Sequence, residues 1–294
     1  MYNGQKAGGQ ARPAPGRFPT TGGFFREKGM HMKQEPSLIV SRTGAVVTLA
    51  INNLKKHNAL TPGCLAEIER TFDELTREDE ARVVVLRGAG DKAFSAGADI
   101  MAMPVKGEAR VPEARATPTR ALEAIQRFPY PVVAMIYGYA LGAGCILALA
   151  CDIRIAAESV KMGVPTSRMG LLSDYRTFKR FLTVLGYGPA LEIFLTGRSY
   201  DSRECLAMGL VGHVVETERL ESFTADLVGE IARCAPLSLR GSKLILNKIA
   251  ENPTPFPEDL EAFRALGLEA VKSDDHEEAK RAFREKRKPH FTGR

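Results

Sequence analysis

The sequence predicts an α/β half followed by a helical end, and three observations support this. Short runs rich in branched aliphatic residues recur at intervals, at residues 45–52, 82–86, 131–136 and 152–157. Helical patterns separate these runs, as expected for parallel strands joined by crossover helices and covered on both faces. From residue 177 onward the pattern is helical, apart from one short strand predicted at 212–215.

The first predicted elements are a hairpin and a helix. Residues 37–41 and 45–52 are β-rich runs, and Gly44 between them is typical of a tight turn. Thr61 stands where a helix cap is expected, directly before Pro62, a residue favoured in the first turn. The helix that follows places four apolar residues on one face, Leu65, Ile68, Phe72 and Leu75.

The middle of the chain is less regular. A polar stretch follows the strand at 82–86 and continues to about residue 117, and we expect it to be mobile around 105–113. A helix is predicted at 121–128, and an Ala/Leu/Cys helix at 144–150. The predicted helices of the C-terminal part are 177–185, 189–195, 202–208, 220–233, 237–250, 258–271 and 275–287.

Composition limits the class of partner. Of the 294 residues, 44% are hydrophobic and 26% are charged, which is ordinary usage for a globular protein with a large core. The net charge of +6 is dispersed apart from a basic run at 281–288, and no recognition-module pattern accompanies it. We therefore expect no nucleic-acid partner. No apolar run approaches the 18 or so residues of a membrane span, so no membrane association is predicted.

The N-terminus and the cysteines bear on location. Residues 1–36 are rich in glycine, proline and basic residues, and we interpret them as a disordered leader. The five cysteines are scattered without metal-ligand spacing, which predicts buried thiols, a reducing compartment and no metal site. A cytoplasmic protein is expected, or one of an organelle matrix if the leader acts as a transit peptide.

Two turns of small residues, 93–100 and 138–145, follow the strands at 82–86 and 131–136. Ligands of open parallel sheets bind beyond the carboxyl ends of strands. The second turn leads into a helix, whose first amides have no intrahelical partner and can stabilise a developing negative oxygen. The glycines equally fit a purely structural role in close packing, and spacing alone favours that interpretation.

These two turns resemble signature stretches of the crotonase superfamily, the enoyl-CoA hydratase/isomerase family. Residues 52–60, 203–215 and 283–291 are similar to further stretches of that family, in the same order. The resemblance implies a ββα spiral core, here residues 37–200, and a helical trimerisation region, here residues 201–294. It also implies a homo-trimer or hexamer that binds an acyl-CoA thioester, with no cofactor beyond the CoA moiety.

The resemblance also implies roles for particular residues. The thioester oxygen would accept hydrogen bonds from the backbone amides of Ala98 and Ala143. Ala143 replaces the family's usual glycine, but a helical φ tolerates its Cβ. The matching CoA-contacting positions are Lys56, Ala96, Asp99 and Ile100. Phe283 and Lys286 match two further positions, which reach the CoA of a neighbouring subunit. The alternative is that they are an ordinary packed Phe and a solvated Lys.

The chain departs from the family's hydratase pattern. A hydratase uses two glutamates as general acid and base, but the matching positions hold Ile146 and Thr166. Two-carboxylate hydration is therefore not expected. An inefficient hydration would need help from Thr166, Ser167, Tyr175 or an acid of residues 105–117.

Asp174 matches a catalytic aspartate of two other branches of the family. In dienoyl-CoA isomerases this residue shuttles protons, and in 4-chlorobenzoyl-CoA dehalogenase it is the nucleophile. We predict an isomerase-type enzyme with Asp174 as acid–base. The alternatives are a nucleophilic Asp174, or a non-catalytic acyl-CoA-binding protein in which Asp174 is a helix N-cap.

Overall fold

The computed structural model describes residues 37–99, 112–252 and 257–294. The expected leader, residues 1–36, lies outside these ranges. In the described part of the chain, one sheet has six strands, antiparallel only between the first two and parallel elsewhere. In spatial order its strands are β1 (Leu38–Thr43), β2 (Val46–Ile51), β3 (Val83–Gly88), β5 (Val132–Ile136), β7 (Ile153–Ala157) and β9 (His213–Val215).

A second, smaller parallel sheet consists of β4 (Ala93–Ser95), β6 (Tyr139–Leu141) and β8 (Lys161–Gly163). Each of its strands directly follows a strand of the large sheet, and a helix comes next along the chain. This strand–strand–helix unit occurs three times in succession, which confirms the expected ββα spiral. The sequence patterns did not indicate these strands, because a run of three residues is too short to show a period.

The first helix follows the prediction. α1 (Pro62–Glu78) is capped by Thr61, whose hydroxyl accepts a 3.1 Å hydrogen bond from the amide of Cys64. All four residues of its predicted apolar face are buried. They pack with residues of the large sheet into the main hydrophobic core, to which α2 and α3 also contribute.

The second helix differs from the prediction. α2 (Pro112–Arg127) begins nine residues before the predicted start at residue 121. Its first turns contain Pro118 and polar residues. Proline has no backbone donor for a helical hydrogen bond, so this stretch resembles a loop in sequence. Residues 112 and 113, predicted to be mobile, are thus helical, and residues 105–111 lie outside the described ranges.

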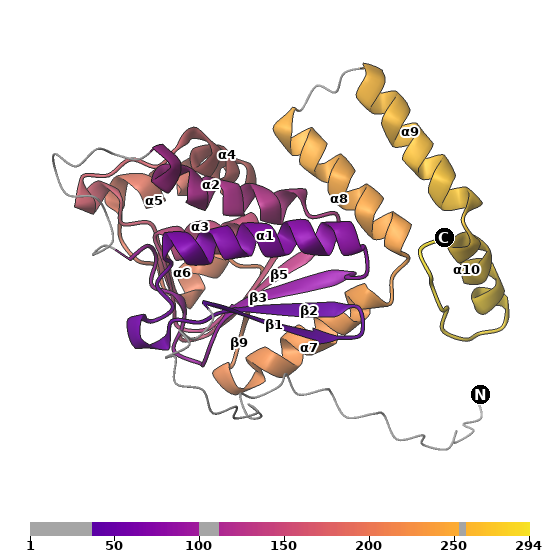
Figure 1. Cartoon of the computed structure of the whole chain (residues 1–294), viewed down its shortest axis with the longest axis horizontal. Helices are drawn as coiled ribbons and strands as arrows, with labels where there is room; N and C mark the ends of the chain where they lie inside the picture. The colour runs from indigo at the N-terminus through magenta and orange to yellow at the C-terminus, as the bar shows by residue number, and fades with distance from the viewer. Residues whose placement is uncertain (1–36, 100–111, 253–256) are drawn as a thin grey trace, which may run out of the picture.

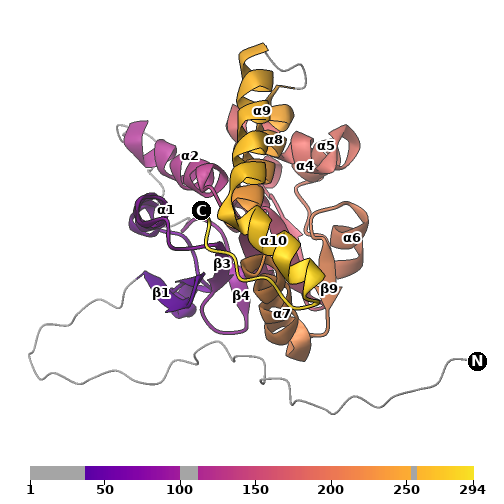
Figure 2. The same ribbon diagram turned by 90° about the vertical axis from the view of Figure 1, so that its right-hand side faces the viewer.

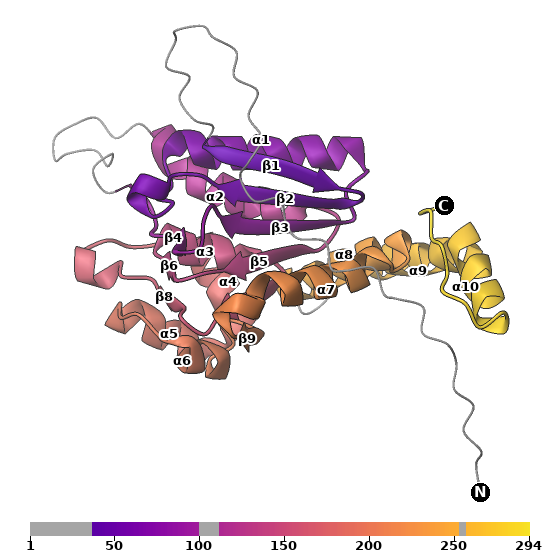
Figure 3. The same cartoon turned by 90° about the horizontal axis from the view of Figure 1, so that it is seen from below.

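The remaining helices lie around and beyond the sheets (Figure 1). Their bounds are η1 (Leu54–Lys56), α3 (Ala143–Ala150), η3 (Ser167–Met169), α4 (Tyr175–Leu185), α5 (Tyr187–Thr196), α6 (Ser202–Ala207), η4 (Thr217–Arg219), α7 (Leu220–Ala232), α8 (Pro236–Glu251), α9 (Pro257–Lys272) and α10 (Asp274–Arg284). α7 covers the face of the large sheet opposite α1, through Leu220 and Val228. Helices α8 to α10 extend away from both sheets as an arm, as Figures 2 and 3 show.

A buried lysine anchors the arm. Lys243 of α8 donates hydrogen bonds to the carbonyls of Ile125 (3.4 Å) and Tyr130 (2.9 Å), and pairs with Asp152 at 2.7 Å. Burial lowers the pKa of Lys243, and the attraction of Asp152 opposes this shift. Since Ile125 is near the end of α2 and Asp152 follows α3, the carboxyl ends of these two helices lie together.

Other expectations concern single features. Four cysteines are buried, but Cys234 is exposed near the end of α7, which corrects the expectation that all five thiols are buried. No group of three or more metal-ligating side chains occurs among the described residues. None of the helices described has both the length and the apolar character needed to cross a membrane.

Candidate functional site

The two turns of small residues meet beyond β4 and β6. Gly97 has a φ of +100°, and a Cβ placed on it would lie 2.7 Å from the carbonyl oxygen of Leu141 and 3.5 Å from the amide nitrogen of Ala143. A Cβ on Gly144 would lie 2.5 Å from the carbonyl oxygen of Ser95. Both glycines thus permit an approach that any side chain would prevent. The structural role of the glycines is confirmed, and the same approach brings the two predicted amides close together.

An isolated parallel β-bridge between Leu60 and Ala98 sets the direction of the Ala98 amide. Leu60 donates a 2.8 Å hydrogen bond to the carbonyl of Gly97 and accepts one of 3.1 Å from the amide of Asp99. In this parallel bridge the amide of Ala98, between those two groups, faces away from Leu60. Within the described ranges it donates to no protein acceptor.

The amide of Ala143 is at the first position of α3. Gly142, the N-cap, has a φ of +52°, and the turn is closed by a 2.8 Å hydrogen bond from its amide to the carbonyl of Gly163. The first amides of a helix have no intrahelical acceptor and carry the positive end of the helix dipole. The start of α3 is therefore suited to stabilise a negative oxygen that lies close to its first amides.

Ile146 lies in the first turn of α3, and Thr166 lies three residues after the strand that is bonded to Gly142. Ile146 is one turn into α3, where its amide donates to the carbonyl of Gly142 at 3.0 Å, and its side chain packs against the core. Thr166 follows β8, whose last residue is bound to Gly142, and is half-buried. Neither side chain exchanges protons near neutral pH, so the two positions supply no general acid or base.

Asp174 is the N-cap of α4. One carboxylate oxygen accepts a 2.9 Å hydrogen bond from the amide of Thr177, as the N-cap alternative predicted. The other accepts a 2.9 Å hydrogen bond from the hydroxyl of Thr119 on α2. The residue is exposed, so its carboxylate is accessible from solvent.

Helix α2 also supplies a carboxylate that the sequence reasoning did not consider. Glu123, one turn after Thr119, pairs with Arg176 in the first turn of α4. Two contacts thus join α2 to the start of α4, one through Asp174 and one through Arg176. Both α2 residues are near or within the predicted 121–128 helix, but nothing in the local pattern indicates a partner more than 50 residues away.

Three of the predicted CoA contacts lie together next to the Ala98 turn. Lys56 pairs with Asp99 at 2.6 Å, and the amide of Ala96 donates a 2.9 Å hydrogen bond to the carbonyl of His57. Lys56 and Ala96 are exposed, and the ammonium of Lys56 is engaged by Asp99. The fourth position, Ile100, lies outside the described residues.

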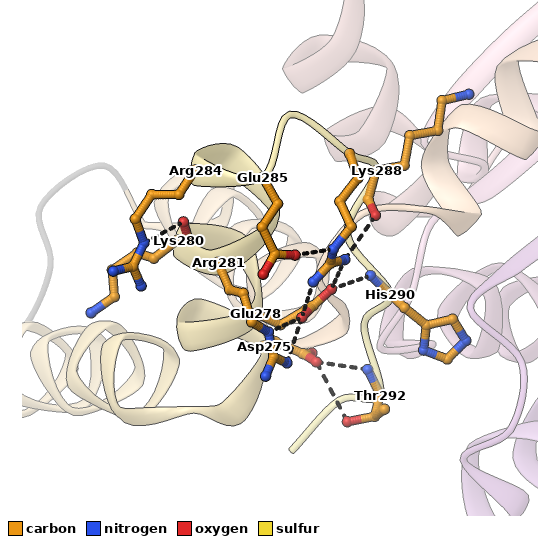
Figure 4. A network of polar contacts seen from close by, with 10 residues as sticks. Asp275, Glu278, Lys280, Arg281, Arg284, Glu285, Lys288, His290 and Thr292 are labelled. Carbon is orange, nitrogen blue, oxygen red and sulfur yellow. Dashed lines mark hydrogen bonds and ion pairs between the residues drawn. The ribbon is translucent and has the colours of Figure 1, made fainter.

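Phe283 and Lys286 lie at the far end of the arm, away from this site in the same chain (Figure 3). Phe283 is 86% exposed, so it is not the packed side chain that an ordinary structural role implies. The tail beyond α10 folds back along the helix, as Figure 4 shows. Glu278 accepts hydrogen bonds from Arg281, Arg287 and the amide of His290, while two backbone amides, of Thr292 and Gly293, donate to Asp275.

Comparison with known proteins supports the predicted family. A family model described as enoyl-CoA hydratase/isomerase matches residues 41–294. The short-chain-enoyl-CoA hydratase of Clostridium acetobutylicum is 31% identical over 254 residues, which cover 86% of this chain and 96% of that protein. The methylmalonyl-CoA decarboxylase of Escherichia coli is 31% identical over 257 residues, covering 84% and 95% of the two chains.

A solved structure agrees with these relatives. The enoyl-CoA hydratase/carnithine racemase from Magnetospirillum magneticum has a TM-score of 0.82 and 34% identity, and the match covers 89% of this chain and 97% of that one. Sequence, fold and the meeting of the two turns therefore lead to one conclusion. The chain belongs to the enoyl-CoA hydratase/isomerase family.

Proposed function

We propose that the protein binds an acyl-CoA thioester with its carbonyl oxygen between the amides of Ala98 and Ala143. The supporting observation is the close approach of the two turns through Gly97, together with the lack of a protein acceptor for either amide among the described residues. Two such donors stabilise an enolate oxygen more than a neutral carbonyl, because negative charge develops there during the reaction. Asp174 is the proposed acid–base group.

An isomerase-type reaction fits these groups better than efficient hydration. Moving a proton between two carbons of an enolate needs one carboxylate that accepts and returns it. Hydration needs a second group to activate water, and Ile146 and Thr166 replace the two glutamates that would do so. Among relatives of this chain, one is named a hydratase and another a decarboxylase, so the fold accommodates more than one acyl-CoA reaction.

A non-catalytic acyl-CoA-binding protein is the second candidate. The observation that favours it is the engagement of both Asp174 oxygens, one by Thr177 and one by Thr119. A carboxylate used only as a cap would leave binding intact and provide no chemistry.

The proposed assembly is a homo-trimer or hexamer. α4 and α5 present an apolar groove of about 260 Å³, lined by Tyr175, Phe178, Lys179, Leu182, Tyr187, Ala190, Leu191 and Phe194. Exposed apolar surface of this kind is typical of a subunit interface. In such an assembly Phe283 and Lys286 would reach the CoA of a neighbouring subunit, since they lie far from the site of their own chain.

The proposal is tested by incubating the purified full-length protein with a panel of CoA thioesters and analysing the products by mass spectrometry. Conversion of at least one thioester supports the enzyme, and binding without conversion supports the second candidate. Calorimetry gives the binding, with NAD and ATP as controls that we expect to bind much more weakly. Absence of heat with every acyl-CoA would contradict both candidates.

A further inference from the structure

An arginine of α4 binds the carboxyl end of α3, the helix that begins with Ala143. The guanidinium of Arg180 donates hydrogen bonds to the carbonyls of Leu149 (2.7 Å), Ala150 (3.3 Å) and Cys151 (3.0 Å). α3 has only eight residues, so its two ends are about 10–12 Å apart at 1.5 Å per residue. A helix this short moves as a rigid unit, and a displacement of its end displaces its first amide as well.

Arg180 is half-buried, with its guanidinium directed at the carbonyls that end α3. Burial lowers the pKa of Arg180, and the attraction of Asp152 opposes the shift. No carboxylate lies within ion-pair distance of Arg180 in the described ranges, so the three carbonyls are its main partners. A cation at this end also complements the negative end of the helix dipole.

The same arginine belongs to α4, which begins at Tyr175. Asp174 caps α4, and Arg180 follows it by six residues, less than two helical turns. α3 and α4 pack against one another. One end of α4 therefore carries the proposed acid, while its middle holds the helix that supplies the proposed oxyanion amide.

We propose that Arg180 is a positioning residue that sets the distance between the Asp174 carboxylate and the Ala143 amide. This inference rests on the proposed function, because it assumes that both groups act on one thioester. Proton transfer depends steeply on such a distance, and a misplacement of about 1 Å can cost about 10²-fold in rate. Lysine at this position would retain the charge but lose the planar fork that engages three carbonyls at once.

The test compares the full-length wild type with the Arg180→Lys and Arg180→Gln variants. The first readout is the infrared stretching frequency of the thioester carbonyl of bound crotonyl-CoA, identified by ¹³C labelling of that carbon. Hydrogen bonds from the two amides lower this frequency. The second is turnover of the substrate that the thioester panel identifies. We expect both variants to lose much of the frequency shift and to lower kcat about tenfold or more, with the affinity for free CoA unchanged.

Arg154→Lys is the matched control. Arg154 of β7 is a second arginine at the end of α3. It is buried and donates to the carbonyls of Cys151 (2.9 Å) and Leu210 (2.8 Å), but it does not belong to α4. We expect this variant to be destabilised to a similar extent while the carbonyl shift and kcat stay within about twofold of wild type, since the link between α3 and α4 is intact. Circular dichroism melting curves show which variants are folded, and only folded variants are compared.

The outcomes separate this inference from the proposed function. If bound crotonyl-CoA shows no carbonyl shift in the wild type, the proposed oxyanion site is wrong irrespective of Arg180. If the wild type shows the shift and a folded Arg180 variant keeps both the shift and kcat, Arg180 has only a structural role and the inference is overturned. Equal losses in the Arg154 control would overturn it as well.

Discussion

The hydroxyl of Thr119 donates a 2.9 Å hydrogen bond to a carboxylate oxygen of Asp174, although 55 residues separate the two. The bond joins α2 to the first turn of α4, and the pair of Glu123 with Arg176 joins the same two helices. The orientation of the proposed acid therefore depends on α2 as well as on its own helix. The proposed acid, the oxyanion amides and the exposed surfaces can each be tested by a change of residue or of pH.

Replacing Ala143 by proline should remove one oxyanion donor without unfolding the protein. Proline has no amide hydrogen, but it is favoured at the first position of a helix, where Ala143 lies. We expect turnover to fall about 10²–10³-fold with a melting temperature close to wild type. Ala143→Gly keeps the donor and should retain most activity. Full activity of the proline variant would show that this amide does not contact the reacting oxygen.

Replacing Asp174 by asparagine should separate chemistry from helix capping. Asparagine caps a helix about as well as aspartate, so α4 should form normally. Turnover should fall about 10²-fold or more while the affinity for acyl-CoA stays nearly unchanged. A nucleophilic Asp174 would also leave a trapped ester in the quenched wild-type enzyme, visible by mass spectrometry, and an acid–base role would not. Undiminished turnover of the asparagine variant would show that Asp174 is only a helix cap.

Hydration of crotonyl-CoA should be slow. Each missing general acid or base removes about 10²–10⁴-fold, and the family resemblance places Ile146 and Thr166 at both positions. The measurement is the loss of the enoyl-thioester absorbance, compared with a hydratase of the family that has two glutamates. A comparable rate would mean that another carboxylate serves the reaction, and Glu123 would be the first to replace.

Light scattering at micromolar concentration should give the mass of a trimer or hexamer. Leu182 and Leu191 line the α4–α5 groove and are 49% and 42% exposed in the single chain. Aspartate at both positions would place charge in a subunit interface, so the double variant should dissociate. Val40→Asp, at a comparably exposed apolar residue of β1, is the control and should keep the wild-type mass. A monomeric wild type would contradict the proposed assembly.

The fold-back of the C-terminal tail should weaken in acid. Hydrogen bonds from Arg287, Arg281 and the amide of His290 hold the pKa of Glu278 well below its usual range. A carboxylate with a lowered folded-state pKa stabilises the folded form above its unfolded pKa of about 4.3, and this contribution is lost as the pH falls toward the folded value. Hydrogen exchange between pH 7 and 3 should show protection at His290 declining below about pH 4.

Glu278→Gln is the comparison for this experiment, because it cannot titrate. Its tail should be less protected at pH 7, and its protection relative to the core should change little with pH. A wild-type tail that is equally protected at pH 3 and pH 7, after correction for intrinsic exchange, would mean that Glu278 does not hold it.

Much of the fold was predictable because it depends on local patterns. The buried face of α1 follows from helical spacing, and its start follows from Thr61 and Pro62, which act on backbone groups within one turn. The central strands of the large sheet, β2, β3, β5 and β7, are apolar runs that are largely buried where they pair. The two small-residue turns were identified as a candidate site because each follows such a strand.

The tertiary structure decided what local patterns do not encode. Gly97 and Ala143 come together only because β4 and β6 pair, and those strands are too short to have a signature of their own. The partners of Asp174 and of α3 are Thr119 and Arg180, brought there by helix packing across tens of residues. Phe283 resembles a core residue in sequence, yet it is exposed at the end of an arm. Local sequence determines which elements form, whereas contacts between distant side chains depend on how those elements pack.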